Sequence, residues 1–262
     1  MILEEIAKRT VERVAELKQR KPEEQVISEA KAFNPNTGFP FEKALRAEGL
    51  SFICEIKKAS PSQGIIAPDF PYLQIAKDYE AAGAAAISVL TEPYWFQGQD
   101  RFLTEISKEV DLPLLRKDFI VDSYQIYEAK IIGASAILLI CALLNTDTLK
   151  DYLDIAHSLG LSALVEAHTE GEVRSALAAG ARVIGVNNRN LKTFEVDLTT
   201  SIKLRGLVPE DRLFISESGI KSPEDVVMLK ANNTDAVLIG ETLMRSDHKK
   251  EQLAHLRGER IQ

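Results

Sequence analysis

The sequence is poor in cysteine, with only Cys54 and Cys141 among its 262 residues, and each lies within an apolar run. Two cysteines in these positions exclude a disulfide framework, and they lack the paired spacing of a metal site. The four histidines also lack the spacing of metal ligands; they are His157, His168, His248 and His255. We therefore expect reduced, buried thiols and no bound metal.

Excess positive charge and long apolar runs are also missing. The chain has 32 lysines and arginines against 39 aspartates and glutamates, a net charge of −7, which argues against a nucleic-acid binder or a protein of anionic membranes. No window reaches the ~18 apolar residues of a membrane span, and the charged amino terminus lacks the apolar core of a signal peptide. We expect a cytoplasmic protein without nucleic-acid or membrane partners, in which an anionic ligand would need a locally basic pocket.

The composition is otherwise that of an ordinary globular protein, 45% hydrophobic and 27% charged, in a chain long enough to bury one large core. Short apolar runs recur, each followed by a helical pattern, at the spacing of consecutive strand and helix units in a parallel sheet. The eight runs are residues 52–56, 85–90, 112–115, 136–140, 163–165, 183–186, 213–215 and 236–239. An open, doubly wound sheet would show the same alternation, but eight units favour an α/β fold of the (β/α)8 or TIM-barrel class.

The amino-terminal residues do not belong to this repeat. An amphipathic helix is predicted there by apolar residues that recur at helical spacing among charged ones: Ile2, Ile6, Val11, Val14 and Leu17. A second helical stretch is expected at residues 39–47. We expect one domain over residues 1–262, with a helical extension at 1–47 and the barrel at 48–262. The extension could close the floor of the barrel or reach its mouth, and the pattern does not choose between these positions.

Polar side chains at the strand ends are the candidates for chemistry, because active-site groups of a parallel barrel come from the carboxyl ends of its strands. In the first strand, the period of two places Glu55 and Lys57 on the face opposite Cys54 and Ile56. A structural ion pair or an exposed edge strand would show the same pattern. The polar, turn-rich loop at 58–64 favours a ligand site, since such loops present hydroxyls and backbone amides.

Three later strand ends add further ionisable or polar groups. Lys117 ends the third strand among apolar neighbours and other cations, which predicts a lowered pKa suited to proton donation or to a Schiff base near neutrality. Glu166 shares its phase with Leu164, and Asn187 shares its phase with Gly185. A carboxylate and an amide therefore point toward the barrel axis, unless Glu166 is a helix-capping acid and Asn187 a turn residue.

The last two strands are followed by glycines, in Ser218-Gly219 and in Gly240-Glu241. Glycines let backbone N–H groups approach an anion, and a short helix beginning near Glu241 would add its amino-terminal partial positive charge. Phosphate sites after the seventh and eighth strands recur in such barrels. These two turns therefore predict a phosphate cup, with tight turns that bind nothing as the alternative.

Six blocks of the sequence, in this order, resemble the indole-3-glycerol-phosphate synthase family, and the similarity covers nearly the whole chain. The blocks are residues 55–62, 117–122, 164–166, 185–191, 216–220 and 238–244. The resemblance implies a (β/α)8-barrel carboxy-lyase of tryptophan biosynthesis that needs no metal or organic cofactor. The reaction implied converts 1-(2-carboxyphenylamino)-1-deoxyribulose 5-phosphate to indole-3-glycerol phosphate with loss of carbon dioxide and water.

The resemblance also implies catalytic roles for five residues. Lys117 matches the general acid at the substrate carbonyl oxygen, and Lys57 matches a lysine that binds the carboxylate and transfers protons. Glu166 matches the acid–base carboxylate of the dehydration. Glu55 and Asn187 match residues that orient the substrate and the lysines.

Binding positions are implied in the same way. The phosphate and substrate positions are Ser60, Arg189, Ser218, Gly219, Gly240 and Glu241. The apolar slot for the aromatic ring is formed by Phe96, Leu115, Phe119 and Leu138, which would otherwise be ordinary core. The chain departs from many relatives at Gln63, where they carry a basic residue, and we expect a slightly weaker anion field there.

Other functions of a phosphate-binding barrel fit the same residues. A Schiff-base aldolase could use Lys57 or Lys117, and an amino-sugar isomerase would release no carbon dioxide. A non-catalytic phosphate binder would not need the two lysines and Glu166. In each case the expected partner is a small phosphorylated molecule, a phosphorylated carboxylate for the synthase reaction, and the protein is expected to be a monomer or a weak homo-oligomer.

Overall fold

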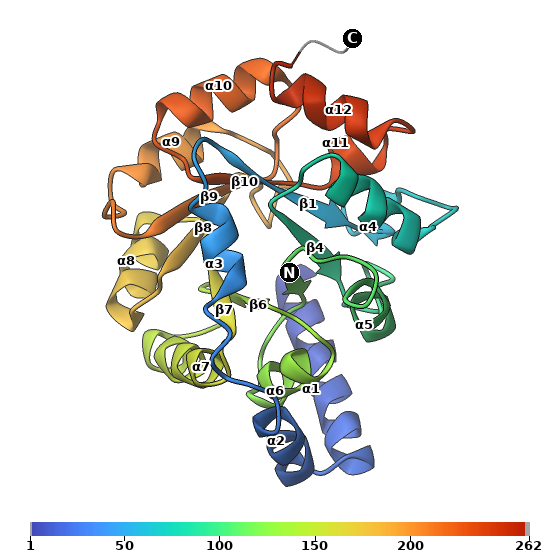
Figure 1. The fold of residues 1–262 in the computed structure, drawn as a ribbon. Coiled ribbons are helices and arrows are strands. Elements are labelled where there is room, and N and C mark those ends of the chain that lie inside the picture. The colour runs from blue at the N-terminus through green and yellow to red at the C-terminus, as the bar shows by residue number, and fades with distance from the viewer. Residues whose placement is uncertain (1, 260–262) are drawn as a thin grey trace.

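The eight predicted apolar runs form a closed ring of parallel strands in a computed structural model that describes residues 2–259 (Figure 1). The strands are β1 (Ser51–Ile56), β4 (Ala86–Leu90), β5 (Leu114–Lys117), β6 (Ala136–Ile140), β7 (Ser162–Ala167), β8 (Val183–Asn187), β9 (Leu213–Glu217) and β10 (Ala236–Ile239). β1 pairs with β4 on one side and with β10 on the other, which closes the ring. The barrel prediction is confirmed, and the open sheet is excluded. Met1 and residues 260–262, the ends of the predicted domain, lie outside the described residues.

Helices surround the ring and follow the strands (Figure 1). They are α4 (Tyr72–Ala81), α5 (Asp100–Ile106), α6 (Tyr124–Ile131), α7 (Thr146–Ser158), α8 (Glu170–Ala179), α9 (Thr199–Arg205), α10 (Pro223–Ala231), α11 (Glu241–Met244) and α12 (Lys249–Leu256). Local sequence fixes their ends: α10 begins at a capping box between Ser222 and Asp225. α8 ends at Gly180, whose φ of 90° suits glycine and terminates the helix.

Alternate strand residues pack on opposite sides of the ring. Cys54 and Ile56 of β1 belong to the apolar layer between strands and helices. Ile53 of the same strand packs inside the ring with Leu115 and Leu164. The predicted period of two is therefore confirmed, and the polar residues in phase with Ile53 face the interior at the carboxyl ends of the strands.

The amino-terminal extension contains three helices, α1 (Ile2–Arg20), α2 (Glu23–Lys31) and α3 (Pro40–Leu45). α3 lies across one opening of the ring in Figure 1, where Phe41 and Leu45 are buried with Ile53 of β1 and Ala86 of β4. These are floor positions at the amino ends of the strands. α1 instead reaches the other opening, as described below, and α2 packs against α6. Both positions left open by the sequence are occupied, each by a different helix.

The loop after β1 carries a small antiparallel hairpin, β2 (Ala59–Ser60) and β3 (Gly64–Ile65), which the sequence did not predict. Two-residue strands are too short to produce a hydrophobic period. The hairpin stands at the carboxyl end of the ring and holds the loop over it. Among residues 2–259, no helix combines the length and apolar character needed to cross a membrane.

Candidate active site

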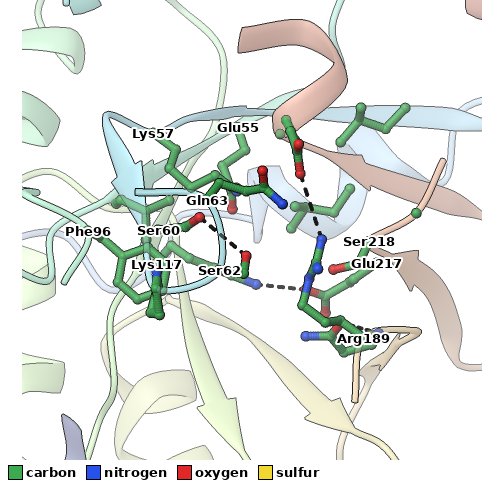
Figure 2. Close-up of a pocket in the computed structure, with 18 of the residues that line it drawn as sticks. Glu55, Lys57, Ser60, Ser62, Gln63, Phe96, Lys117, Arg189, Glu217 and Ser218 are labelled. Atoms are coloured by element: carbon green, nitrogen blue, oxygen red, sulfur yellow. Dashed lines mark hydrogen bonds and ion pairs between the residues drawn. The ribbon is translucent and has the colours of Figure 1, made fainter. Parts of the chain in front are cut away.

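A cavity of about 940 Å³ opens at the carboxyl ends of the barrel strands (Figure 2). Every residue predicted for the site lines it, with the exception of Leu115. Leu115 precedes Lys117 by two residues on β5, and its side chain is fully buried in the apolar interior. It therefore supports the cavity from below. The opposite wall includes Ile2, Leu3 and Ile6 of α1, so the extension forms part of the mouth.

Lys117 ends β5 with its ammonium group held between carboxylates. Its Nζ lies 2.7 Å from Oε2 of Glu217 and 3.5 Å from Oε2 of Glu166 (Figure 2). Burial disfavours the charge on this lysine, but the carboxylates of Glu217, Glu166 and Glu55 outweigh burial and raise the pKa of Lys117 above its usual value. The predicted lowering of this pKa is wrong, because anions from other strands surround the group. Lys117 is a protonated acid at neutral pH.

Glu217 received no role from the sequence, yet it makes the shortest contact to Lys117. Its side chain is 2% exposed, and burial raises the pKa of its carboxyl, with the charge of Lys117 acting in the opposite direction. Its position on β9 carried a signal, since it shares the inward phase of Ile215. The same phase argument had identified Glu55 and Glu166.

Lys57 and Glu55 form a second pair at the end of β1 (Figure 2). Nζ of Lys57 lies 2.6 Å from Oε1 of Glu55, and the two side chains are 15% and 6% exposed. Burial alone would raise the pKa of Glu55, but the charges of Lys57 and Lys117 outweigh burial and lower it. Glu55 therefore stays ionised and orients the ammonium group beside it.

Two glycines leave the space that these carboxylates occupy. A Cβ atom on Gly185 would lie 2.2 Å from Oε1 of Glu217, and one on Gly240 would lie 2.3 Å from Oε1 of Glu55. Both distances are far inside van der Waals contact. A side chain at either position would displace a charged group of the cavity.

Asn187 and Arg189 shape the turn after β8. Oδ1 of Asn187 accepts the backbone N–H of Arg189 at 3.0 Å. The Arg189 guanidinium donates to the carbonyl of Phe194 at 3.1 Å and lies 3.8 Å from Oε2 of Glu241. Glu241 also accepts from Arg245 at 3.1 Å, so its carboxylate is turned to two arginines instead of into the predicted phosphate cup.

The two turns that the sequence predicted as a phosphate cup both line the cavity. Ser218 and Gly219 after β9 have φ values of 66° and 88°, the first of which is unusual for a residue with a side chain. Asn188 holds this turn, because its Nδ2 donates to the carbonyl oxygen of Ser218 at 3.1 Å. Gly240 precedes the first turn of α11. Ser60, on β2, lines the cavity with these turns.

An apolar slot borders the lysines. The rings of Phe96 and Phe119 are tilted with centroids 6.0 Å apart, and Leu138 lines the same cavity. Phe96 is held by Glu92, a buried carboxylate that accepts the backbone N–H groups of Tyr94, Trp95 and Phe96 at 2.8–2.9 Å. The flat aromatic surface thus has a fixed backbone.

The arrangement places an ammonium acid, a second ammonium group and buried carboxylates between an apolar slot and two glycine-containing turns. Such a site can hold a molecule with a phosphate at one end and an aromatic ring at the other, and can move protons at the centre. Within residues 2–259, no three histidine, cysteine, aspartate or glutamate side chains are grouped as metal ligands.

Solved structures with a similar fold are enzymes of the same barrel class. A 3-hexulose-6-phosphate synthase aligns with a TM-score of 0.63 and 13% identity, covering 80% of this chain and 99% of the other. A mutant tryptophan synthase α-subunit from Pyrococcus furiosus aligns with a TM-score of 0.60 and 15% identity, covering 80% and 98%. Identities this low establish the fold alone.

Sequence relatives are far more similar. The family model for indole-3-glycerol phosphate synthase matches residues 3–256. A protein of that name from Ruminiclostridium cellulolyticum is 60% identical over 258 residues, covering 98% of this chain and 99% of the relative. Another of that name, from Endomicrobium trichonymphae, is 55% identical over 257 residues, covering 98% and 100%. The chain therefore belongs to the indole-3-glycerol phosphate synthase family.

Proposed function

We propose that the cavity carries out the reaction named by the family, the conversion of 1-(2-carboxyphenylamino)-1-deoxyribulose 5-phosphate to indole-3-glycerol phosphate. The observation that carries the proposal is the position of Lys117 between Glu166 and Glu217, beside an apolar slot and two anion-binding turns. Carbon dioxide and water leave the substrate in this reaction. The enzyme is thus a carboxy-lyase of tryptophan biosynthesis.

Lys117 is the general acid. A ring carbon of the substrate attacks the carbonyl carbon, and the electrons of the carbonyl bond move to its oxygen, which must take up a proton. Lys117 holds that proton because the surrounding carboxylates raise its pKa. Glu166, within 3.5 Å of the ammonium group, takes the proton that is lost when water leaves.

Lys57 binds the carboxylate of the substrate. Its ammonium group, oriented by Glu55 at 2.6 Å, pairs with the carboxylate until carbon dioxide departs and the benzene ring is restored. Asn187 holds the turn that bounds this region. Bringing the two reacting carbons together between fixed ends supplies up to ~7–11 kcal/mol of the barrier reduction.

The phosphate lies in the cup made by the turns at Ser218-Gly219 and Gly240-Glu241, with Ser60 donating its hydroxyl. Glycine backbones allow N–H groups to approach the anion, and the partial positive charge at the start of α11 adds attraction. The carboxylate of Glu241 stays paired with Arg189 and Arg245, which removes its repulsion of the phosphate. Arg189 supports the turn and the charge balance.

The aromatic ring lies in the slot formed by Phe96, Phe119 and Leu138, with Leu115 beneath. Gln63 accepts a hydrogen bond from Arg245 at 3.1 Å. It contributes no charge of its own to the phosphate region, in keeping with a weaker anion field than a basic residue would give.

We further propose that residues 1–262 form one domain, since Phe41 of the extension is buried inside the ring and Ile6 lines the mouth. A monomer or weak homo-oligomer in the cytoplasm fits a cavity built within one chain and two buried thiols. No metal or organic cofactor is required by the proposed steps.

The direct test is to incubate the purified protein with the anilino-deoxyribulose phosphate and to follow indole fluorescence and carbon dioxide release. An aldolase would instead be trapped by borohydride as a lysine adduct, and an isomerase would convert its substrate without carbon dioxide. Failure to form indole-3-glycerol phosphate under mild conditions would defeat the proposal.

Lys117→Ala is expected to lower kcat by about 10²–10⁴-fold, the usual contribution of a positioned acid, with a much smaller loss of affinity. Steady-state kinetics give kcat, and calorimetric titration of the slow variant with substrate gives the affinity. Lys203→Ala, at an exposed position of α9, is the matched control and should keep the wild-type rate. A variant at Lys117 with unchanged turnover would remove this lysine from the mechanism.

A further inference from the structure

His168 lies directly behind Glu166, outside the cavity lining, with its imidazole between two carboxylates. Nε2 of the ring lies 3.5 Å from Oε1 of Glu166, and Nδ1 lies 3.4 Å from Oε2 of Glu172. The side chain is 14% exposed, and neither ring nitrogen makes a hydrogen bond to any of residues 2–259, so both contacts are contacts between charges. Both nitrogens of this ring therefore face carboxylates in a largely dry environment.

The position of the ring is fixed from two sides. His168 follows the last residues of β7, which also carries Glu166. Glu172 in the first turn of α8 accepts the backbone N–H of His168 at 2.6 Å, so the same carboxylate holds the main chain and faces the ring. The main chain that carries the imidazole is thereby fixed at the junction of β7 and α8.

These contacts form a chain of groups that runs from α8 into the cavity. Glu172 contacts His168, His168 contacts Glu166, Glu166 contacts Lys117, and Lys117 contacts Glu217. With a protonated imidazole, the five charges alternate in sign along the whole chain. A neutral imidazole would leave both neighbouring carboxylates without a cation on that side, which is costly where water is excluded.

We propose that His168 is a positioning residue whose imidazolium, held by Glu172, keeps Glu166 oriented and ionised for its reaction with the substrate. The inference rests on the role proposed above for Glu166 and adds a group that never touches the substrate. In this arrangement His168 orients the base, and Glu166 accepts the proton.

The electrostatic surroundings of the ring support a cation at neutral pH. Burial disfavours protonation of His168, but the nearby carboxylates of Glu172 and Glu166 outweigh burial and raise its pKa. Glu217 on β9 acts in the same direction. The thiol of Cys141, which directly follows β6, stays uncharged, since burial raises its pKa to about 12. Lys117 on β5 faces Glu166 from the far side.

The sign of the expected effect follows from the charge. Replacing His168 with a neutral side chain removes a cation 3.5 Å from Glu166, and with it a favourable charge interaction of the ionised base. Turnover requires the ionised base. The acidic limb of the pH–rate profile should therefore move to higher pH, while the alkaline limb stays in place.

The experiment measures kcat for the formation of indole-3-glycerol phosphate from about pH 5 to about pH 9, the range in which histidines and perturbed carboxyls titrate. In His168→Gln the acidic limb should move up by roughly 1–3 pH units, the shift expected from an opposite charge at this range. Glu172→Gln should move it in the same direction by less, because Gln keeps the backbone contact and the neutral imidazole remains. Adding His168→Gln to Glu172→Gln should give the profile of His168→Gln alone.

The matched control is His157→Gln, the same substitution at another partly buried histidine, which packs against Phe39 on the floor side of the barrel. Its profile should match the wild type. An unchanged acidic limb in His168→Gln would overturn the inference, and so would an equal shift in His157→Gln.

A measurement without turnover separates this inference from the proposed function. NMR titration of the His168 ring in the unliganded protein should place its protonation above the usual histidine value, and at lower pH in Glu172→Gln and Glu166→Gln. A ring that titrates at or below the usual value refutes the inference, even if His168→Gln fails to fold. If the wild type forms no indole-3-glycerol phosphate, the proposed function fails, while this titration still tests whether the His168 ring is protonated between its two carboxylates.

Discussion

Gly185 and Gly240 are single residues whose missing side chains allow the charged groups of the cavity to exist. Each lies on or beside a strand, where a larger residue would give a better strand. The space beside Gly185 holds a carboxylate oxygen of Glu217, and the space beside Gly240 holds one of Glu55. Glycine at these two positions makes the strands less stable, but it leaves space for the carboxylates of the site.

Gly185→Ala is expected to displace the carboxylate of Glu217, because the new Cβ atom would lie 2.2 Å from its Oε1. The ion pair between Glu217 and Lys117 should therefore lengthen or break. A misplacement of this size typically costs on the order of 10²-fold in kcat. Overpacking should also lower the free energy of unfolding by about 1–3 kcal/mol.

Gly206→Ala provides the comparison for this prediction, because nothing lies within 4 Å of its Cβ position and its φ is −64°. Steady-state kinetics and urea unfolding of the two variants give both quantities. Equal kinetics in the two variants would show that Gly185 does not control the position of Glu217.

Individual residues also show what sequence alone could provide. The phase of each strand predicted that Glu55 and Glu166 face inward, and the same rule applied to Glu217 would have found the missing partner of Lys117. The direction in which the pKa of Lys117 is shifted could not be predicted, since it depends on carboxylates contributed by β1, β7 and β9. Their convergence is a property of the closed ring.

Helices of the extension act at opposite ends of the barrel, and one ion pair fastens the first of them. Arg13 of α1 donates to both carboxylate oxygens of Asp118, at 2.9 and 2.7 Å. The carboxylate is fully buried, directly follows Lys117 and also accepts the backbone N–H of Phe119 at 2.8 Å. A helix outside the repeat is thereby joined to the strand that delivers the acid.

Arg13→Ala is expected to lower the free energy of unfolding by about 1–3 kcal/mol, since it removes hydrogen-bond donors from a buried acceptor. The loss stays moderate because Asp118 keeps a contact with Arg116 at 3.4 Å. Arg174→Ala breaks an ion pair with Glu170 whose side chains are 66% and 60% exposed, and should cost less than about 0.5 kcal/mol. Urea unfolding would contradict this account if both variants lost the same amount.

Elements were predictable where their pattern was long enough. The predicted ends of all eight strands lie within two residues of the observed ends, because each strand carries several apolar residues and is followed by a helix. Neither α2 nor the hairpin of β2 and β3 was predicted. α2 has nine residues with few apolar positions, and the two strands have two residues each, so both give little periodic signal. The position of the extension depends on packing partners far away in the sequence, so no local pattern could have chosen it.

The molecule as a whole separates support from chemistry along the barrel axis. Phe41 and Leu45 of α3 fill the amino-terminal opening, whereas the ionisable groups of the cavity lie at the carboxyl-terminal opening. In barrels of this class, residues at the floor serve stability and residues at the opposite end serve function.

Phe41→Ala is expected to lower the free energy of unfolding by ~3–5 kcal/mol, the usual loss for removing a buried phenylalanine ring. Because the floor lies away from the cavity, kcat and KM of the folded protein should remain close to the wild-type values. Phe33→Ala, at a residue that is 47% exposed, is the same substitution without a cavity to create and should be nearly neutral. A changed KM in Phe41→Ala would mean that floor packing is transmitted to the site.

Closure of the ring by β1 and β10 determines when this protein can become active during its synthesis. Glu55 and Lys57 are translated well before Gly240, which directly follows β10, the last strand of the ring. The missing side chain of Gly240 leaves the space that Glu55 and Lys57 occupy. Until β10 has been translated, β1 can pair only with β4. The ring is then still open, so the carboxylates of the site do not yet line one enclosed cavity. The helices and strand pairs of a nascent chain can form progressively, whereas the site is complete only once β10 has closed the ring beside β1.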